Sequence, residues 1–177
     1  GIELKAQFWK SLSRKVKGSR ALTRDRIPTN AELKRLIMLM PPQGKALVLL
    51  LLSSGMRIGE ALQIEVRDLE LDKEPIQINI RGEYTKTGNP RLAFASSEAK
   101  ELLQDWLRLK PSYIENANKK PYNKKPVDDP RVFPFQQSTA YMIYINALNK
   151  AGLAEKDAST DRNTRHLHTL RKFFRTR

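Results

Sequence analysis

Four basic side chains, in three separate stretches of the chain, have the chemistry to hold a phosphodiester and move its protons: Arg57, Lys86, His168 and Arg171. The guanidinium of arginine is a planar fork of donors that fits two oxygens of one phosphate. Two such forks could stabilise charge that develops on the non-bridging oxygens. The ammonium of Lys86 could protonate a leaving oxygen, and the imidazole of His168 could transfer a proton near neutral pH. Together they could surround a phosphodiester without a metal ion.

Taken singly, each of these residues has an ordinary interpretation. Arg57 could be a solvated arginine that pairs with Glu60, and Lys86 could be the charged tip of a hairpin. His168 and Arg171 are three residues apart and would share one helix face, which is common on protein surfaces. Two histidines in a chain without cysteine are a weak metal signal, and we expect no metal site. The phosphate-binding interpretation therefore depends on the whole set.

Arg57 stands in the segment SSGMRIGEAL, residues 53–62. An apolar run ends just before this segment, the chain leaves it through Gly55, and a new helical pattern begins at Arg57. The N-terminus of a helix carries partial positive charge, so a cation is locally disfavoured there. The arrangement is explained if an anion occupies that position.

The composition indicates a nucleic acid as the source of the anion. The chain has 177 residues, with 33 Lys and Arg, 19 Asp and Glu, a formal net charge of +14 and 40% apolar residues. These values are typical of a folded basic domain that contacts a phosphate backbone. The longest apolar run, residues 46–52, is too short to span a bilayer, and we expect no membrane partner. A chain without cysteine or a signal-peptide pattern is compatible with the cytoplasm, which is the expected location.

Two other classes of phosphoryl-transfer protein lack their usual motifs in this sequence. No paired carboxylates occur in a D-x-D-like setting, which argues against a two-metal nuclease. No glycine-rich phosphate loop indicates the use of ATP. We therefore expect no cofactor.

Helices would position most of the four basic residues. Thr29 and Glu32 have the spacing of a capping box, and residues 46–52 belong to a helix that should be central and buried. His168 and Arg171 would lie on the last helix. Five helices are expected. The first begins within 27–32 and stops at Pro41-Pro42, and the second covers about 44–54. The third follows a cap at Ser96 or Ser97, the fourth includes 141–148 and ends at Gly152, and the last begins within 167–174.

A hairpin would position Lys86. The apolar residues that alternate with others in two short runs are Ile76, Ile78, Ile80, Leu92 and Phe94. Gly88-Asn89-Pro90 marks the turn between the two strands. Residues 110–134, rich in proline and lysine, predict a long surface loop, and residues 154–165 predict a polar one. The predicted fold class is mainly α with a small antiparallel β-sheet (α+β).

Three motifs together resemble the catalytic domain of the tyrosine recombinases, the phage integrase family: SGMRIGEAL, a hairpin bearing TKTG, and HTLR. The order Arg, Lys, His-x-x-Arg matches, as do the strands between the first two motifs. The resemblance covers about residues 27–177, and RGEYTKTGNPR and HTLRKFFRTR are most similar to archaeal integrases. It implies the catalytic-domain fold of DNA breaking-rejoining enzymes.

The resemblance also implies an activity, which is site-specific recombination or integration of double-stranded DNA without a metal ion. Arg57 and Arg171 would clamp the scissile phosphate, and Lys86 would contact it and act as general acid for the 5′-hydroxyl leaving group. His168 would assist proton transfer, and Glu60 would brace the site without reacting. A tyrosine would attack and give a 3′-phosphotyrosine intermediate. The full-length protein would act as a tetramer on DNA.

The sequence departs from the family pattern at the nucleophile. The family's attacking tyrosine lies well downstream of His-x-x-Arg, whereas six residues follow Arg171 here. Tyr84, Tyr141 and Tyr144 precede the motif and are interpreted as structural. We therefore expect a domain truncated before its nucleophile, which is a monomer that binds DNA but is inactive on its own.

The chain is expected to contain two parts. Residues 1–26, with eight Lys or Arg and two acidic residues, would be the end of a preceding DNA-binding domain and a basic linker. Within them, Phe8 and Trp9 would end a helix. Residues 27–177 would be the catalytic domain.

Two alternative functions fit parts of the same pattern. A non-catalytic basic module that binds DNA or RNA would have the same composition, and the lack of a suitable tyrosine favours it. An enzyme like the type IB topoisomerases would share the strand-cleavage chemistry. Phosphate contacts on three separate segments favour a recombinase over the binding module.

Overall fold

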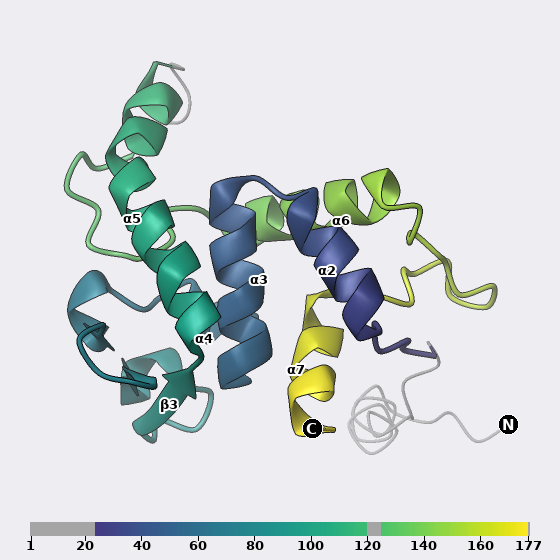
Figure 1. The fold of residues 1–177 in the computed structure, drawn as a ribbon, viewed down its shortest axis with the longest axis horizontal. Coiled ribbons are helices and arrows are strands. Elements are labelled where there is room, and N and C mark those ends of the chain that lie inside the picture. The colour runs from purple at the N-terminus through teal and green to yellow at the C-terminus, as the bar shows by residue number, and fades with distance from the viewer. Residues whose placement is uncertain (1–23, 120–124, 177) are drawn as a thin grey trace, which may run out of the picture.

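The structure is a computed structural model that describes residues 24–119 and 125–176, and helices dominate it (Figure 1). The helices are α2 (Asn30–Met38), α3 (Pro42–Ser54), α4 (Ile58–Ala61), α5 (Ser97–Asn118), α6 (Gln137–Lys150) and α7 (Leu167–Arg175), with 3-10 turns η1 (Val66–Asp68) and η2 (Gly82–Tyr84). The strands are β1 (Leu69–Glu70), β2 (Ile76–Ile80) and β3 (Arg91–Ala95), which form one antiparallel sheet. The predicted fold class is confirmed. Among the described helices, none is long and apolar enough to cross a bilayer.

Most of the expected segment at residues 1–26, including the helix expected to end at Phe8 and Trp9, lies outside the described residues.

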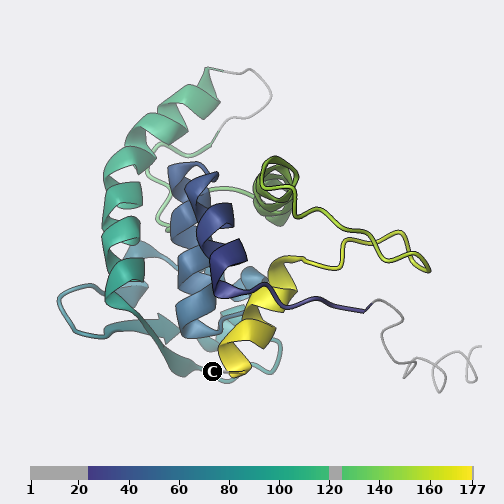
Figure 2. The same cartoon turned by 45° about the vertical axis from the view of Figure 1, so that its right-hand side comes forward.

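Helix α3 forms the centre of the molecule, as its composition predicts. Seven of its 13 residues are buried, and it contacts α2, α5, α7 and β3. Figures 1 and 2 show α3 between α5 on one side and α7 on the other. Because neighbouring elements cover α3 on several sides, packing holds its C-terminal end at Ser54 in place. The residues that follow Ser54 therefore start from a well-defined position.

The faces of the sheet are set by the pairing of β2 with β3. Ile78 of β2 lies opposite Ala93, and cross-strand partners share a face of the sheet. Ala93 and Ala95 are therefore buried on the same face as the isoleucines, while Leu92 and Phe94 are exposed. The alternating pattern predicted the strand correctly, and its small residues form the buried face.

Helix caps follow the sequence signals. The hydroxyl of Thr29 accepts the N–H of Glu32 (3.3 Å), and the Glu32 carboxylate accepts the N–H of Thr29 (2.8 Å), which is the predicted capping box. Ser96 caps α5 by accepting the N–H of Ala99 at 3.4 Å. Pro42 is the first residue of α3, where its missing N–H loses no hydrogen bond.

The prediction of a loop over residues 110–134 is wrong for its first part, because α5 continues through Pro111 to its end at Asn118. A proline inside a helix removes one hydrogen bond and is normally unfavourable. Here the following turn is packed: the ring of Tyr113 lies 5.3 Å from that of Trp106 in an edge-on contact, and Ile114 is buried. This apolar packing offsets the lost hydrogen bond.

Candidate functional site

A groove of about 440 Å³ lies where α4, the loop between β2 and β3, and the start of α7 come together. The four basic residues selected from the sequence, Arg57, Lys86, His168 and Arg171, all line it. The other lining residues are Met56, Ile58, Gly59, Glu60, Gln63, Tyr84, Thr85, Gln137 and Leu167. The fold thus brings three distant segments of the sequence to one open cavity with a basic wall.

Arg57 reaches the groove because the chain turns sharply after α3. Gly55 adopts a left-handed conformation with φ of 62°, which is strained for residues with a Cβ atom. Arg57 then precedes α4 in extended conformation, and the carboxylate of Glu60 accepts its backbone N–H (2.7 Å) and its Nη1 donor (2.9 Å). The ordinary pairing with Glu60 is therefore present, but it leaves the Arg57 side chain 48% exposed. Glu60 aims the guanidinium rather than shielding it.

Glu60 is a buried carboxylate with two arginine partners. Its side chain is 2% exposed, and Arg91 donates Nη1 to Oε1 (3.2 Å) and Nη2 to Oε2 (2.8 Å). Burial by itself raises the pKa of Glu60, but hydrogen bonds from Arg91 and from the backbone and side chain of Arg57 outweigh it and hold the pKa below its ordinary value. Glu60 is therefore ionised at neutral pH.

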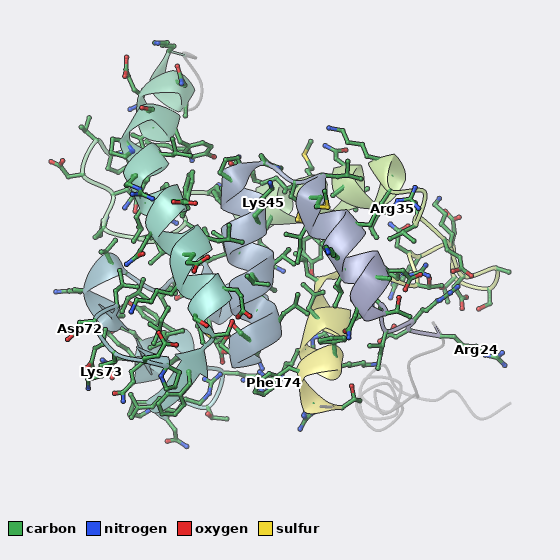
Figure 3. The ribbon with its side chains drawn as sticks, viewed as in Figure 1. Arg24, Arg35, Lys45, Asp72, Lys73 and Phe174 are labelled. Atoms are coloured by element: carbon green, nitrogen blue, oxygen red, sulfur yellow. The ribbon has the colours of Figure 1, made fainter. Side chains whose placement is uncertain are left out.

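Arg171 is held at the groove by the end of α3, because its Nη1 donates to the carbonyl oxygen of Gly55 at 2.6 Å. Figure 3 shows Phe174 on the side of α7 that faces the end of α3. A Cβ atom on Gly55 would lie 2.3 Å from the ring of Phe174, so the close approach of α7 requires glycine. Desolvation and the positive charge of Arg57 lower the pKa of Arg171, and both cations line the same groove. A bound anion would relieve their repulsion.

His168 is exposed on the first turn of α7, and its ring stacks on His166 with centroids 6.3 Å apart. Desolvation and then the positive charges of His166, Lys172 and Arg171 lower the pKa of His168 below its ordinary value of 6.5. Asp25 opposes this effect, but it is engaged by His166 at 3.0 Å and by Lys172. The neutral imidazole, which can accept a proton, is therefore favoured near neutral pH.

Lys86 lies in the loop between β2 and β3, and the loop is braced from within. The hydroxyl of Thr85 donates to two carbonyl groups of the same loop, at 2.9 and 3.1 Å. Arg81, at the start of the loop, donates Nε to the buried carboxylate of Asp68 at 2.8 Å. These bonds fix the base of the loop while the Lys86 side chain stays exposed at the groove.

Among the described tyrosines, Tyr84 lies at the groove. The guanidinium of Arg81 lies 5.2 Å from the centre of its ring. Desolvation and the nearby carboxylate of Asp68 raise the pKa of Tyr84, which disfavours the phenolate. The described tyrosines that do not line the groove are Tyr113, Tyr141 and Tyr144.

Sequence reasoning missed two residues of this region. Arg91 binds Glu60, and its one sequence signal is a cation directly after the hairpin turn in TKTGNPR. Gln137 lines the groove from the start of α6 and had no signal. Within residues 24–119 and 125–176, no group of three or more His, Cys, Asp or Glu could hold a metal ion.

Comparison with known proteins gives one family and several similar folds. Residues 28–177 match the sequence profile of the phage integrase family. The curated proteins gave no match. The crystal structure of XerA recombinase is similar with a TM-score of 0.61 and 23% identity, over 96% of this chain and 56% of that chain.

Two DNA-bound structures are also similar. XerH site-specific recombinase, bound to difH substrate in a pre-cleavage complex, has a TM-score of 0.62 and 21% identity over 90% of this chain and 44% of that one. A lambda integrase(75-356) dimer bound to a COC′ core site has a TM-score of 0.55 and 14% identity over 94% and 60%. The chain therefore spans about half the length of these proteins. The expected tyrosine recombinase fold is confirmed, and the archaeal subgroup stays a prediction.

Proposed function

Because the chain belongs to the phage integrase family, we propose that it serves site-specific DNA recombination, cleaving and rejoining strands through a 3′-phosphotyrosine intermediate. The observation that supports this most directly is the groove shared by Arg57, Lys86, His168 and Arg171. The scissile phosphate of double-stranded DNA would occupy this groove. Its negative charge would lie between two arginines that otherwise repel each other.

Each residue has a role that its geometry supports. Arg57 and Arg171 each use Nη1 on a protein acceptor, so other guanidinium donors are available for the non-bridging oxygens. Lys86 would give a proton to the departing 5′-oxygen, and the neutral His168 would assist transfer of the proton from the attacking hydroxyl. Phosphorus exchanges one ester bond for another, so rejoining is the same reaction in reverse and needs no metal or cofactor.

We further propose that the attacking tyrosine is not among the described tyrosines and belongs to another segment of the same molecule or of a partner molecule. Tyr84 is at the groove, but it lies under Arg81 and its raised pKa disfavours the nucleophilic form. Tyr144 is buried in the core, where burial raises its pKa to about 12. Provided that Tyr122, which lies outside the described residues, is not the nucleophile either, the 177-residue chain would bind DNA without cleaving it.

The wider organisation is proposed on the same basis. Residues 1–26 would link a preceding DNA-binding domain to the catalytic domain, residues 27–177. The XerH and lambda integrase structures contain DNA, which supports DNA as the partner. The full-length protein would work as a tetramer in the cytoplasm, while the 177-residue chain would be a monomer.

Trapping of a covalent protein–DNA adduct tests the proposed function. The protein at its natural length is mixed with a pool of nicked duplexes of random sequence in EDTA, denatured with detergent, and examined for DNA attached to a tyrosine. Sequencing of the trapped strands would give the recombination site. We expect an adduct from the natural-length protein and none from the 177-residue chain.

The possible negative results of the adduct experiment distinguish the alternative functions. If the natural-length protein binds DNA but forms no adduct, the non-catalytic binding module is correct. If the 177-residue chain forms an adduct that Tyr84→Phe abolishes, Tyr84 is the nucleophile.

Lys86→Ala should slow cleavage, and a 5′-bridging phosphorothiolate substrate should restore the cleavage rate, because a sulfur leaving group scarcely needs a proton. Rescue of His168→Ala instead would reverse the two proton-transfer roles.

A further inference from the structure

One buried carboxylate connects the groove to the sheet. Glu60 accepts the backbone N–H and Nη1 of Arg57 through its two oxygens, at 2.7 and 2.9 Å. The same oxygens accept both terminal nitrogens of Arg91, at 3.2 and 2.8 Å. Both arginines therefore depend on one side chain that is 2% exposed.

The position of Arg91 makes it a firm support for Glu60. Arg91 is the first residue of β3 and pairs with Ile80, the last residue of β2. The loop that bears Lys86 spans the interval between these two paired residues. The ion pair between Arg91 and Glu60 thus joins the base of the Lys86 loop to the turn that bears Arg57.

The charges favour this connection in the absence of a ligand. Arg57, Arg91 and Arg171 act on one another near a single carboxylate, since Arg57 and Arg91 lower the pKa of Arg171 and Glu60 raises it. The largest contribution that keeps Glu60 ionised in spite of its burial is the hydrogen bonding from Arg91. A fork that grips both oxygens fixes the plane of a carboxylate, which a single donor does not.

We propose that Arg91 is a positioning residue, which holds Glu60 by both oxygens and so sets the direction of the Arg57 guanidinium relative to Lys86. The inference rests on the proposed function, because it gives the phosphate-binding arginine its geometry. Arg91 does not line the groove and acts through Glu60. It should therefore matter for the rate of cleavage more than for affinity for DNA.

A matched control is available in a second buried ion pair. Arg131 grips Asp129 with Nε to Oδ1 (3.0 Å) and Nη2 to Oδ2 (2.6 Å), and neither residue lines the groove. The two ion pairs are similarly exposed. The arginine side chains are 39% exposed for Arg131 and 35% for Arg91, and the carboxylate side chains are 3% exposed for Asp129 and 2% for Glu60. Arg91→Gln and Arg131→Gln are therefore the same chemical change in comparable surroundings.

The first experiment uses the 177-residue chain and needs no cleavage. Arginine side-chain NMR signals are followed while inorganic phosphate is added, and thermal unfolding confirms that each variant is folded. We expect the phosphate concentration that half-saturates the Arg57 signal to rise about equally in Arg91→Gln and Glu60→Gln, and to be unchanged in Arg131→Gln. Arg91→Lys should recover only part of the loss, because an ammonium cannot grip two oxygens in one plane.

The second experiment uses the natural-length protein and its trapped DNA site. Arg91→Gln should lower the cleavage rate about tenfold and change the affinity for the duplex less than twofold, since Arg91 binds a carboxylate rather than DNA. In an Arg57→Ala background, the same Arg91→Gln change should alter the rate by less than about twofold, because the residue it positions is gone.

Three results would overturn the inference. An Arg91 signal that moves with phosphate as strongly as that of Arg57 would make Arg91 a direct ligand. Additive effects of Arg57→Ala and Arg91→Gln would show that Arg91 acts independently. An equal loss of rate in Arg131→Gln would reduce the effect to general stability. If no variant or parent forms an adduct, the proposed function fails, but the phosphate titration still decides the role of Arg91.

Discussion

Two clusters of arginine and carboxylate use the same residue types in different proportions and at different depths. The groove cluster comprises Arg57, Glu60 and Arg91, and the Arg165 cluster comprises Arg26, Glu32, Glu155 and Arg165. In the first, one buried carboxylate serves two arginines. In the second, two arginines share two carboxylates. Nη2 of the buried Arg165 lies 2.8 Å from Glu32 and its Nη1 lies 3.1 Å from Glu155. The exposed Arg26 lies 3.8 Å from Glu32 and 3.0 Å from Glu155.

The difference decides which guanidinium can bind a ligand. Arg165 is 3% exposed, and its Nη1 also donates to a backbone carbonyl, so both of its terminal nitrogens are engaged inside the protein, while its buried Nε has no hydrogen-bond partner among the described residues. Arg57 is 48% exposed and keeps donors for the groove. Arg165 opens the basic stretch RHLHTLR that ends in Arg171, yet it belongs to the fold and Arg171 belongs to the site. The burial of the guanidinium and the partners of its terminal nitrogens, rather than the basic motif alone, separate the two functions.

The largest effect is expected from the Arg165 cluster. Arg165→Leu removes the buried cation beside Glu32, whose side chain is 17% exposed, while the half-exposed Glu155 keeps Arg26. Removal of one partner of a buried ion pair destabilises a protein by roughly 3 kcal/mol. The free energy of unfolding in urea should fall by about this amount. Arg108→Leu, which removes an exposed arginine paired with Asp105, is the control and should have little effect. A loss below about 1 kcal/mol for Arg165→Leu would mean that this cluster is not structural.

The groove cluster should show the opposite pattern. Arg57→Ala should lower the rate of adduct formation by about a hundredfold, because the lost donors stabilise charge in the transition state. Its free energy of unfolding should change by less than about 1 kcal/mol, since the Arg57 side chain is half exposed and Glu60 keeps Arg91. Single-turnover cleavage and urea unfolding of the same protein samples measure both. If Arg57→Ala lowered the free energy of unfolding as much as it raised the activation free energy of cleavage, the two clusters would not differ in function.

A smaller effect is expected on the salt dependence of DNA binding. Arg57→Ala should reduce the slope of log affinity against log salt by at most about one, because one phosphate contact is lost. Arg165→Leu should leave the slope unchanged in its folded fraction. Fluorescence anisotropy with a labelled duplex across a salt series gives both slopes. A lower slope for Arg165→Leu alone would place Arg165 on the DNA-binding surface.

The smallest expected effect concerns how the stability of the protein depends on pH in the acidic range. The folded protein holds the pKa of Glu60 below its ordinary value of 4.5, so the unfolded state binds the proton first as pH falls. The stability due to Glu60 is therefore complete above pH 4.5 and is lost as pH falls through the lower, folded pKa. Glu60→Gln should make the unfolding temperature less sensitive to pH in this acidic range. An unchanged pH dependence would mean that the Arg91 and Arg57 contacts do not stabilise the ionised form.

The sequence predicted which elements carry the four basic residues because those signals are local. Arg57 follows a buried apolar run and a turn glycine, and His168 and Arg171 are spaced for one helix face. The meeting of these segments at one groove depends on tertiary packing, and the catalytic roles stay predictions. The role of Arg91 could not be predicted, because its partner Glu60 is distant in sequence and the pairing depends on how β3 packs beside α4. Long-range ion pairs have no local signal.

The elements of the fold that have local sequence signals were also predicted, and those that depend on distant contacts were not. Caps at Thr29 and Ser96 and the buried run of α3 are local signals, and the structure has them. The continuation of α5 through Pro111 has no local signal, because the turn after the proline packs on a residue outside the helix: the ring of Tyr113 lies 6.2 Å from that of Phe135. Proline weakens a helix in any sequence, and this contact with a distant residue supports the turn that follows it.

The hydrogen bond from Arg171 to the Gly55 carbonyl has a consequence for the entropy of binding. A free arginine side chain has about 2 kcal/mol of rotamer entropy to lose when a ligand immobilises it. Here part of that loss occurs during folding, since the 2.6 Å bond restricts Arg171 before DNA arrives. The acceptor is a main-chain atom of the left-handed turn that leads to Arg57, so a single glycine would preorganise both halves of the proposed phosphate clamp. Binding is then less sensitive to side-chain disorder than a pair of mobile surface arginines would be.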